Sequence, residues 1–223
     1  MANALQELAI FPLHAVLFPH ATMRLHVFEE RYRIMIRKCL TENKPFGVVL
    51  IRDGEEVGTE AAQPYFVGTF ARIVEVDVHA DGSLDLQIVG EGRFRIRGLD
   101  DEPGYLIGLI ETVFEHPVRH DEEAHRLFAN VREEFEALVK RLFARQDFRV
   151  DVIFPTDPYI LSFTIAALLP MQNLVRQRLL ETTDTIERMR DLQPVLREHL
   201  LESGPGALVQ VDVSELREFQ SPN

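Results

Sequence analysis

The chain has 223 residues, a net charge of −12 and a single cysteine, and its acidic residues are spread through both halves. This length can bury one large core or two smaller ones without disulfides, while the acidity argues against a surface that binds the nucleic-acid phosphate backbone. Apolar runs are far shorter than the roughly 20 residues that span a bilayer, and residues 1–6 lack the features of a signal peptide, so we expect a cytoplasmic protein without a membrane segment.

The most informative run is residues 11–40, where two strands and a helix follow one another without a spacer. Met23, Leu25 and Val27 alternate with polar residues, which predicts a strand with one face on the core. The apolar positions then recur three and four residues apart, which predicts a helix with one buried face. That face comprises Tyr32, Met35, Ile36, Cys39 and Leu40. The single cysteine is therefore expected to be a small buried hydrophobe.

A series of short strands follows. The predicted strands are residues 46–51, 65–79, 84–88, 94–96 and 105–114. The alternation in the second of these slips at Arg72, which predicts a bulge there. Ala80-Asp81-Gly82-Ser83 is typical of a hairpin turn, and Gly90 and Gly92 suggest another tight connection. Short strands at this spacing favour a small barrel over an open parallel sheet.

Beyond residue 115 the pattern becomes helical. The predicted helices are residues 121–146, 158–169, 171–181 and 184–201. Asp157 followed by Pro158 is typical of a capped helix start. We therefore expect a barrel subdomain at residues 1–115, a helical subdomain at 116–203 and a tail at 204–223. The alternating residues 208–213 of the tail are compatible with an edge strand, a docking segment or a disordered terminus.

No catalytic motif is found in the sequence. It lacks the phosphate loop G-x-x-x-x-G-K-[ST], the nucleophile elbow G-x-S-x-G, the zinc pair H-E-x-x-H and the dinucleotide fingerprint G-x-G-x-x-G. His14, His20 and His26 recur every six residues, but strand and turn geometry argues against convergence of their rings on zinc. We expect no enzymatic activity, no cofactor and no metal site.

Several segments occur in an order that is known from one family. They are Phe11-Pro12-Leu13, Val16-Leu17-Phe18-Pro19, Leu25-His26-Val27-Phe28-Glu29, Phe46-Gly47-Val48-Val49-Leu50, Gly68-Thr69-Phe70-Ala71, Gly90-Glu91-Gly92-Arg93-Phe94-Arg95-Ile96 and Gln177-Arg178-Leu179-Leu180-Glu181. Over roughly residues 7–200 the chain resembles the N-terminal, substrate-recognition domain of Lon proteases, in a stand-alone form without their ATPase and protease modules. The resemblance implies an α+β fold, in which a PUA-like, partly open β-barrel is followed by a C-terminal helical bundle.

The resemblance also implies a function. It suggests a non-enzymatic recognition module that binds exposed apolar segments of unfolded or client proteins, as an adaptor in protein quality control, and a separate ATPase or protease is a further candidate partner. The candidate contacts for a peptide are Phe18, Pro19, Phe28, Tyr65 and Phe66. The competing interpretation places these aromatic residues in the barrel core.

An alternative function is RNA binding, because PUA-like barrels commonly bind RNA. The candidate contacts would be an outward-facing stripe formed by Arg93, Arg95 and Arg97. The same stripe is also typical of a charged edge strand that protects against aggregation. The acidity of the chain counts against the RNA hypothesis.

Overall fold

The computed structural model describes residues 4–56, 63–100, 104–143 and 154–202. The chain divides into two compact units. The first comprises Met1–Phe114 together with Asn173–Glu181, and the second comprises Glu115–Gln172 together with Thr182–Asn223. The predicted tail at residues 204–223 lies outside the described residues.

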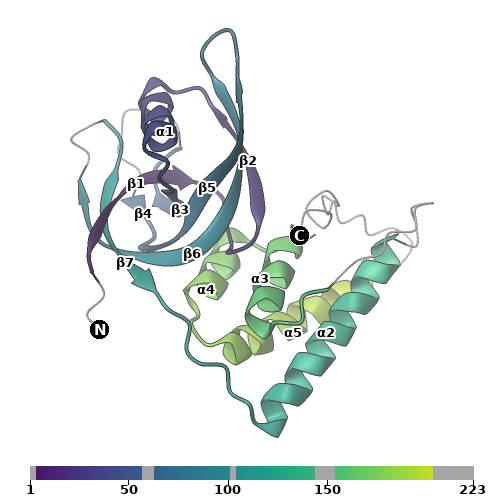
Figure 1. The fold of residues 1–223 in the computed structure, drawn as a ribbon. Helices are drawn as coiled ribbons and strands as arrows, with labels where there is room; N and C mark the ends of the chain where they lie inside the picture. Colours follow the sequence, from purple (N-terminus) through teal and green to yellow (C-terminus); the bar gives the residue numbers. More distant parts are fainter. Residues whose placement is uncertain (1–3, 57–62, 101–103, 144–153, 203–223) are drawn as a thin grey trace. The chain divides into compact units, whose positions relative to one another are not determined.

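The first unit is a barrel built from one sheet (Figure 1). Its strands are β1 (Gln6–Leu13), β2 (Thr22–Val27), β3 (Phe46–Asp53), β4 (Gln63–Pro64), β5 (Val67–Val78), β6 (Leu84–Asp100) and β7 (Ile107–Val113). Pairing runs from β1 through β7, β6, β5 and β3 and returns to β1, while β2 pairs with β6 and β4 with β3. The predicted small barrel is therefore confirmed.

The ring closes through a short parallel ladder. Residues 10–13 of β1 pair with residues 47–50 of β3, whereas residues 6–9 of β1 pair with β7. In the first half of β1, the edge that faces away from β7 has no strand partner among the described residues. The barrel is thus partly open beside this half of β1.

Strand β6 differs from the prediction, because one strand of 17 residues replaces two strands and a tight connection. Gly90 lies within it, donating its N–H to the Ala21 carbonyl (2.9 Å) and accepting from the His20 N–H (2.7 Å). A Cβ at this position would lie 2.2 Å from the Phe18 carbonyl oxygen. The glycine therefore permits a close backbone crossing rather than a turn.

Helix α1 (Glu30–Glu42) packs on the barrel as predicted. It buries Tyr32, Met35, Ile36 and Cys39, and the Tyr32 ring stacks on Phe11 of β1 with centroids 4.4 Å apart. Leu40, which was expected on the same face, is exposed. The barrel core itself contains Leu8, Ile10, Val49, Phe94, Ile96 and Ile110.

The remaining helices divide between the two units. They are α2 (Glu122–Phe143), α3 (Pro158–Leu168), α4 (Asn173–Glu181) and α5 (Thr185–Glu202). Helix α3 begins as predicted, since the Asp157 carboxylate accepts from the Ile160 N–H (3.0 Å). None of the described helices is both long and apolar enough to cross a membrane.

Helix α4 groups with the barrel, although the sequence expectation placed it with the other helices. Its Gln177 side chain donates to the Val67 carbonyl of β5 (3.0 Å). The Arg176 guanidinium lies 5.1 Å from the centre of the Phe18 ring. These long-range contacts attach α4 to the strands.

Candidate functional site

The aromatic residues predicted to contact a peptide fall into two groups. Phe28 and Phe66 are exposed, with 52% and 53% of their surface accessible. Phe18, at 1%, and Pro19 are buried. Tyr65 is half-buried. Of these five candidate residues, only Phe28 and Phe66 therefore offer a substantial apolar surface.

One hollow among the described residues of the barrel unit is a groove of about 400 Å³ beside the first half of β1. We call it the β1 groove. Its apolar lining comprises Leu8, Ala9, Met35, Cys39, Pro45, Phe70, Tyr105 and Ile107. Its polar lining comprises Gln6, Glu7, Lys38, Glu42 and Lys44. Burial raises the pKa of the Cys39 thiol, which keeps this side chain uncharged.

The open edge of β1 borders this groove. The N–H of Ile10 donates to the Leu106 carbonyl beside β7 (2.8 Å). Successive residues of a strand direct their backbone groups to opposite edges. The N–H and C=O groups of Glu7 and Ala9 therefore point away from β7. Backbone hydrogen-bonding groups and an apolar lining thus meet in one place.

A smaller hollow of about 170 Å³ lies beside β2 and the start of α1. Phe28 lines it together with Leu25, Tyr32 and Glu56. Burial raises the pKa of the Tyr32 hydroxyl, so this residue adds no charge to the hollow. The exposed Phe28 therefore borders a real depression of the surface.

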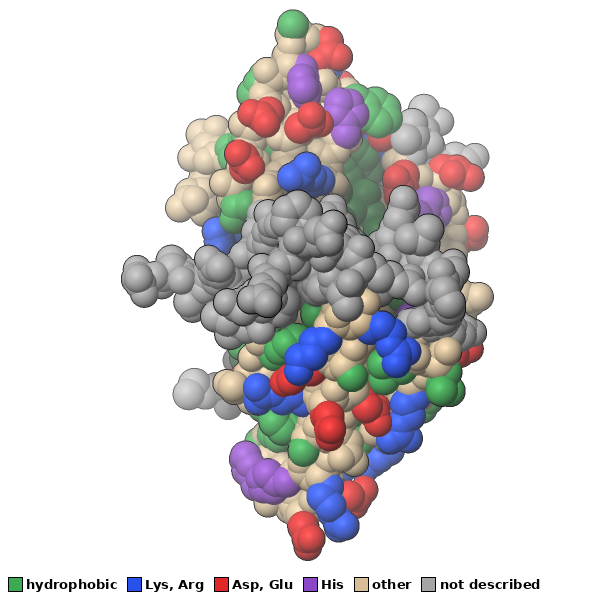
Figure 2. Space-filling model, turned by 90° about the vertical axis from the view of Figure 1, so that its right-hand side faces the viewer, with side chains coloured by type: hydrophobic (Ala, Val, Ile, Leu, Met, Phe, Trp, Pro, Cys, Tyr) green, Lys and Arg blue, Asp and Glu red, His purple; other side chains and the backbone are tan. Residues whose placement is uncertain are grey.

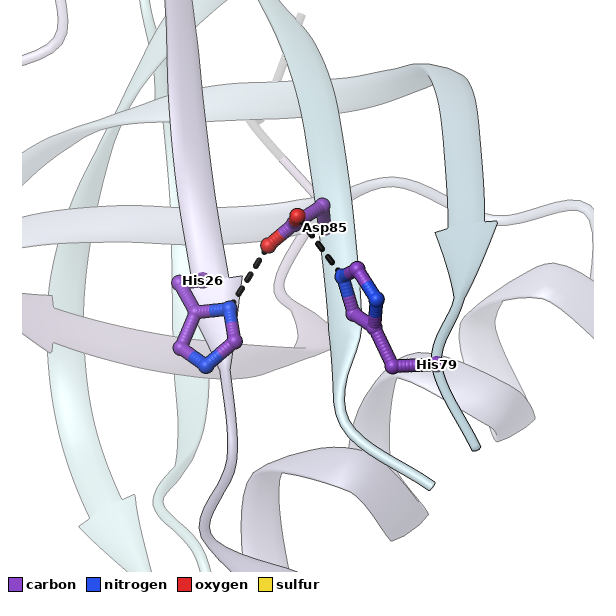
Figure 3. A group of neighbouring side chains, drawn as sticks. All are labelled: His26, His79 and Asp85. Carbon is purple, nitrogen blue, oxygen red and sulfur yellow. Dashed lines mark hydrogen bonds and ion pairs between the residues drawn. The ribbon is translucent and has the colours of Figure 1, made fainter. Parts of the chain in front are cut away.

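A cluster of polar side chains lies near the turn between β5 and β6. His26 Nδ1 is 2.6 Å from Asp85 Oδ1, and His79 Nε2 is 2.7 Å from Asp85 Oδ2. Figure 3 shows the two imidazoles facing the carboxylate from opposite sides. The hydrogen bond to Asp85 raises the pKa of His79. Hydrogen bonds from His26 and His79 lower the pKa of Asp85.

In the sequence, His26 recurs with two other histidines at a six-residue spacing, and their rings were not expected to converge on a metal. Those two are His14 and His20, whereas the ladder pairs His26 of β2 directly with Asp85 of β6. The predicted hairpin turn at residues 80–83 could have placed His79 near Asp85. The pairing of β2 with β6 has no such local signal, so the complete cluster was missed.

The arginine stripe on β6 is not a continuous basic surface. The prediction that Arg93 points outward is wrong, because this residue is 2% exposed and donates from Nη1 to the Leu180 carbonyl of α4 (2.7 Å). Arg95 is half-buried, and Arg97 Nη2 pairs with Glu111 Oε1 at 2.5 Å. The alternation places Arg93 on the face opposite the core, but α4 contacts that face at this residue, so Arg93 is not exposed to solvent.

Comparison with known proteins now assigns the family. Residues 7–198 match the family described as the ATP-dependent protease La (LON) substrate-binding domain. The chain belongs to the Lon substrate-binding domain family. Lon proteases of Anaeromyxobacter dehalogenans and Myxococcus xanthus are 32% and 31% identical to it over 82% and 83% of the chain. The Lon domain described here spans only 22% and 23% of these two relatives.

Solved structures share the fold. The Lon N-terminal domain protein from Xanthomonas campestris is 29% identical, with a TM-score of 0.63 over 85% of this chain and 98% of that chain. The N-terminal domain of Mycobacterium avium complex Lon protease is 20% identical, with a TM-score of 0.66 over 87% of this chain and all of that one. These similarities confirm the α+β fold that the resemblance implied.

Proposed function

We propose that this Lon domain is a recognition module that binds exposed apolar segments of unfolded or client proteins. The observation that supports the proposal most directly is the β1 groove, in which an unpaired strand edge adjoins an apolar lining. The family description, a substrate-binding domain, points to the same class of function. The module itself would perform no chemistry, and an ATP-driven protease, on the same or a separate chain, would act on what it holds.

The groove suits a client segment in extended conformation. An added strand forms backbone hydrogen bonds along an open edge, while pockets accept alternate side chains. Residues 6–9 span roughly 13 Å at about 3.3 Å per residue, which fits four client residues. The volume of about 400 Å³ is within the range of sites that enclose small ligands. Backbone recognition would give affinity with little dependence on client sequence.

Phe28 and Phe66 are proposed as additional contacts. Each has about half of its surface in solvent, and Phe28 lines the smaller hollow. Exposed aromatic side chains gain the most when a partner covers them. The buried Phe18 and Pro19 are not proposed again, because a partner cannot reach them in this structure.

The proposal can be tested by measuring binding of a reduced, alkylated protein that stays unfolded, with fluorescence anisotropy as the readout. Glu7→Pro removes an N–H that faces the groove, at the exposed start of β1 where proline is tolerated. This substitution should weaken binding roughly 2- to 10-fold, because the loss of one hydrogen bond costs about 0.5–1.5 kcal/mol. Glu7→Gln removes the same charge but keeps the N–H, and should bind like the parent.

Two results would contradict the proposal. Equal binding by Glu7→Pro and Glu7→Gln would exclude pairing along this edge. Failure of the parent chain to bind the unfolded protein, together with salt-sensitive binding to a structured RNA, would replace client recognition by the RNA hypothesis. Phe28→Ala and Phe66→Ala should each weaken binding in the same assay.

A further inference from the structure

The cluster near the β5–β6 turn contains the ligand types that zinc prefers. His26 and His79 contribute imidazole nitrogens, and Asp85 contributes carboxylate oxygens. We infer that these three side chains form a binding site for a divalent cation of the zinc class. Two imidazoles and one carboxylate, with a fourth position left for water or another donor, are a common set of zinc ligands.

The ligand atoms are already close to the separation that such a cation requires. They all lie within 4.8 Å of one another. Bonds of about 2.1 Å at tetrahedral angles place ligand atoms about 3.4 Å apart. The nitrogen–oxygen separations of 2.6 and 2.7 Å join His26 and His79 to different oxygens of Asp85, so the side chains must turn for both imidazoles and one oxygen to face the same cation. The side chains are about half exposed, so rotamer changes can supply this rotation.

The backbone positions that carry the ligands are fixed. His26 and Asp85 are direct partners in the β2–β6 ladder. His79 donates its N–H to the Ser83 carbonyl across the turn (2.9 Å). The Asp81 carboxylate accepts from both the N–H and the hydroxyl of Ser83, at 2.9 and 2.7 Å. A rigid frame with adjustable side chains lowers the entropic cost of coordination.

The surroundings favour a cation. Asp77 on β5 is the ladder partner of Asp85, and Asp81 lies in the turn, so negative charge surrounds the ligands. In Figure 2, histidine and acidic side chains gather over the end of this hairpin, at the top of the view. The Phe28 ring stacks on His26, with centroids 6.0 Å apart and planes 25° apart. This contact restrains the orientation of one ligand.

Calorimetric titration of the chain with zinc chloride tests the inference, using protein without an affinity tag in a buffer that does not bind metals. We expect saturable binding of one equivalent, and cobalt(II) should give the visible absorption of a tetrahedral site. Asp85→Asn and His79→Gln should each weaken binding by at least about 10-fold. All three residues are exposed, and circular dichroism of the metal-free variants checks that they fold.

Matched control variants distinguish the loss of a metal ligand from the loss of a negative charge, and distinguish this site from a second pair of histidines. Asp77→Asn changes the charge by the same amount as Asp85→Asn but removes no ligand, so its affinity should stay within about threefold of the parent. His125→Gln tests the pair of His120 and His125 in the helical unit, whose rings are 6.1 Å apart. Absence of saturable binding, an equal loss in Asp77→Asn and Asp85→Asn, or loss only in His125→Gln would overturn the inference.

Discussion

Replacing Glu115 with alanine should destabilise the helical unit by about 3–5 kcal/mol, because it removes the carboxylate that pairs with a buried arginine. Arg188 of α5 is fully buried, and its Nη2 lies 2.6 Å from Glu115 Oε1. The same guanidinium donates to the Thr182 carbonyl (2.6 Å) and the Ser162 hydroxyl (2.9 Å), and lies 3.8 Å from the centre of the Phe163 ring. These neutral partners hold the cation in place but do not neutralise it.

The structure also predicts how the two members of the pair differ. Glu115 is only partly buried, with 17% of its side chain exposed, so it can regain some hydration when Arg188 is absent. The double variant Glu115→Ala with Arg188→Met should therefore be more stable than Glu115→Ala alone, because the methionine leaves no buried charge. Glu115→Gln should be intermediate, since its amide oxygen still accepts hydrogen bonds.

Urea unfolding followed by circular dichroism measures these differences, and native-state hydrogen exchange locates them. A loss of about 3–5 kcal/mol corresponds to a fall in Tm of roughly 6–20 °C for a chain of this size. Protection should fall in α3 and α5 and stay unchanged in β5 and β6, which belong to the other unit. A loss below about 1 kcal/mol for Glu115→Ala, or a double variant no more stable than this single variant, would refute the reasoning.

Two further predictions concern β6 and the histidine cluster. Gly90→Ala should destabilise the barrel by about 1–3 kcal/mol or more, because the new Cβ would lie 2.2 Å from the Phe18 carbonyl oxygen. Gly92→Ala, whose Cβ would meet its nearest atom at 3.8 Å, should be nearly neutral in the same urea unfolding assay, and equal losses would contradict the close crossing. In the metal-free protein, the pKa of His79 is raised, so protonation of this residue stabilises the fold. This stabilisation is fully present at a pH below the unfolded-state pKa of about 6.5, and it is lost as the pH rises through the folded-state pKa. Asp85→Asn should return the His79 pKa, measured by NMR titration of the ring protons, toward that unfolded value, and an unchanged titration would exclude Asp85 as the cause.

Patterns within a few residues determined most of the elements. Alternation predicted β2, the three- and four-residue spacing predicted α1, and Asp157 with Pro158 marked the start of α3. The turn at residues 80–83 was also predictable, and Gly82 adopts a positive φ of 83° there. Each of these signals depends on steric and hydrogen-bonding preferences of neighbouring residues, so the local sequence contains them.

The features that only the tertiary structure decided all depend on contacts between distant residues. Strand alternation places Arg93 opposite the core, but Leu180, 87 residues away, accepts its hydrogen bond and buries it. Gln177 and Val67 are separated by 110 residues, and their contact attaches α4 to the barrel. His26 and Asp85 are 59 residues apart and meet because β2 pairs with β6. Periodicity shows which face of an element is apolar, but it does not show which other element covers the opposite face. The pairing of distant elements therefore determines where the candidate sites lie.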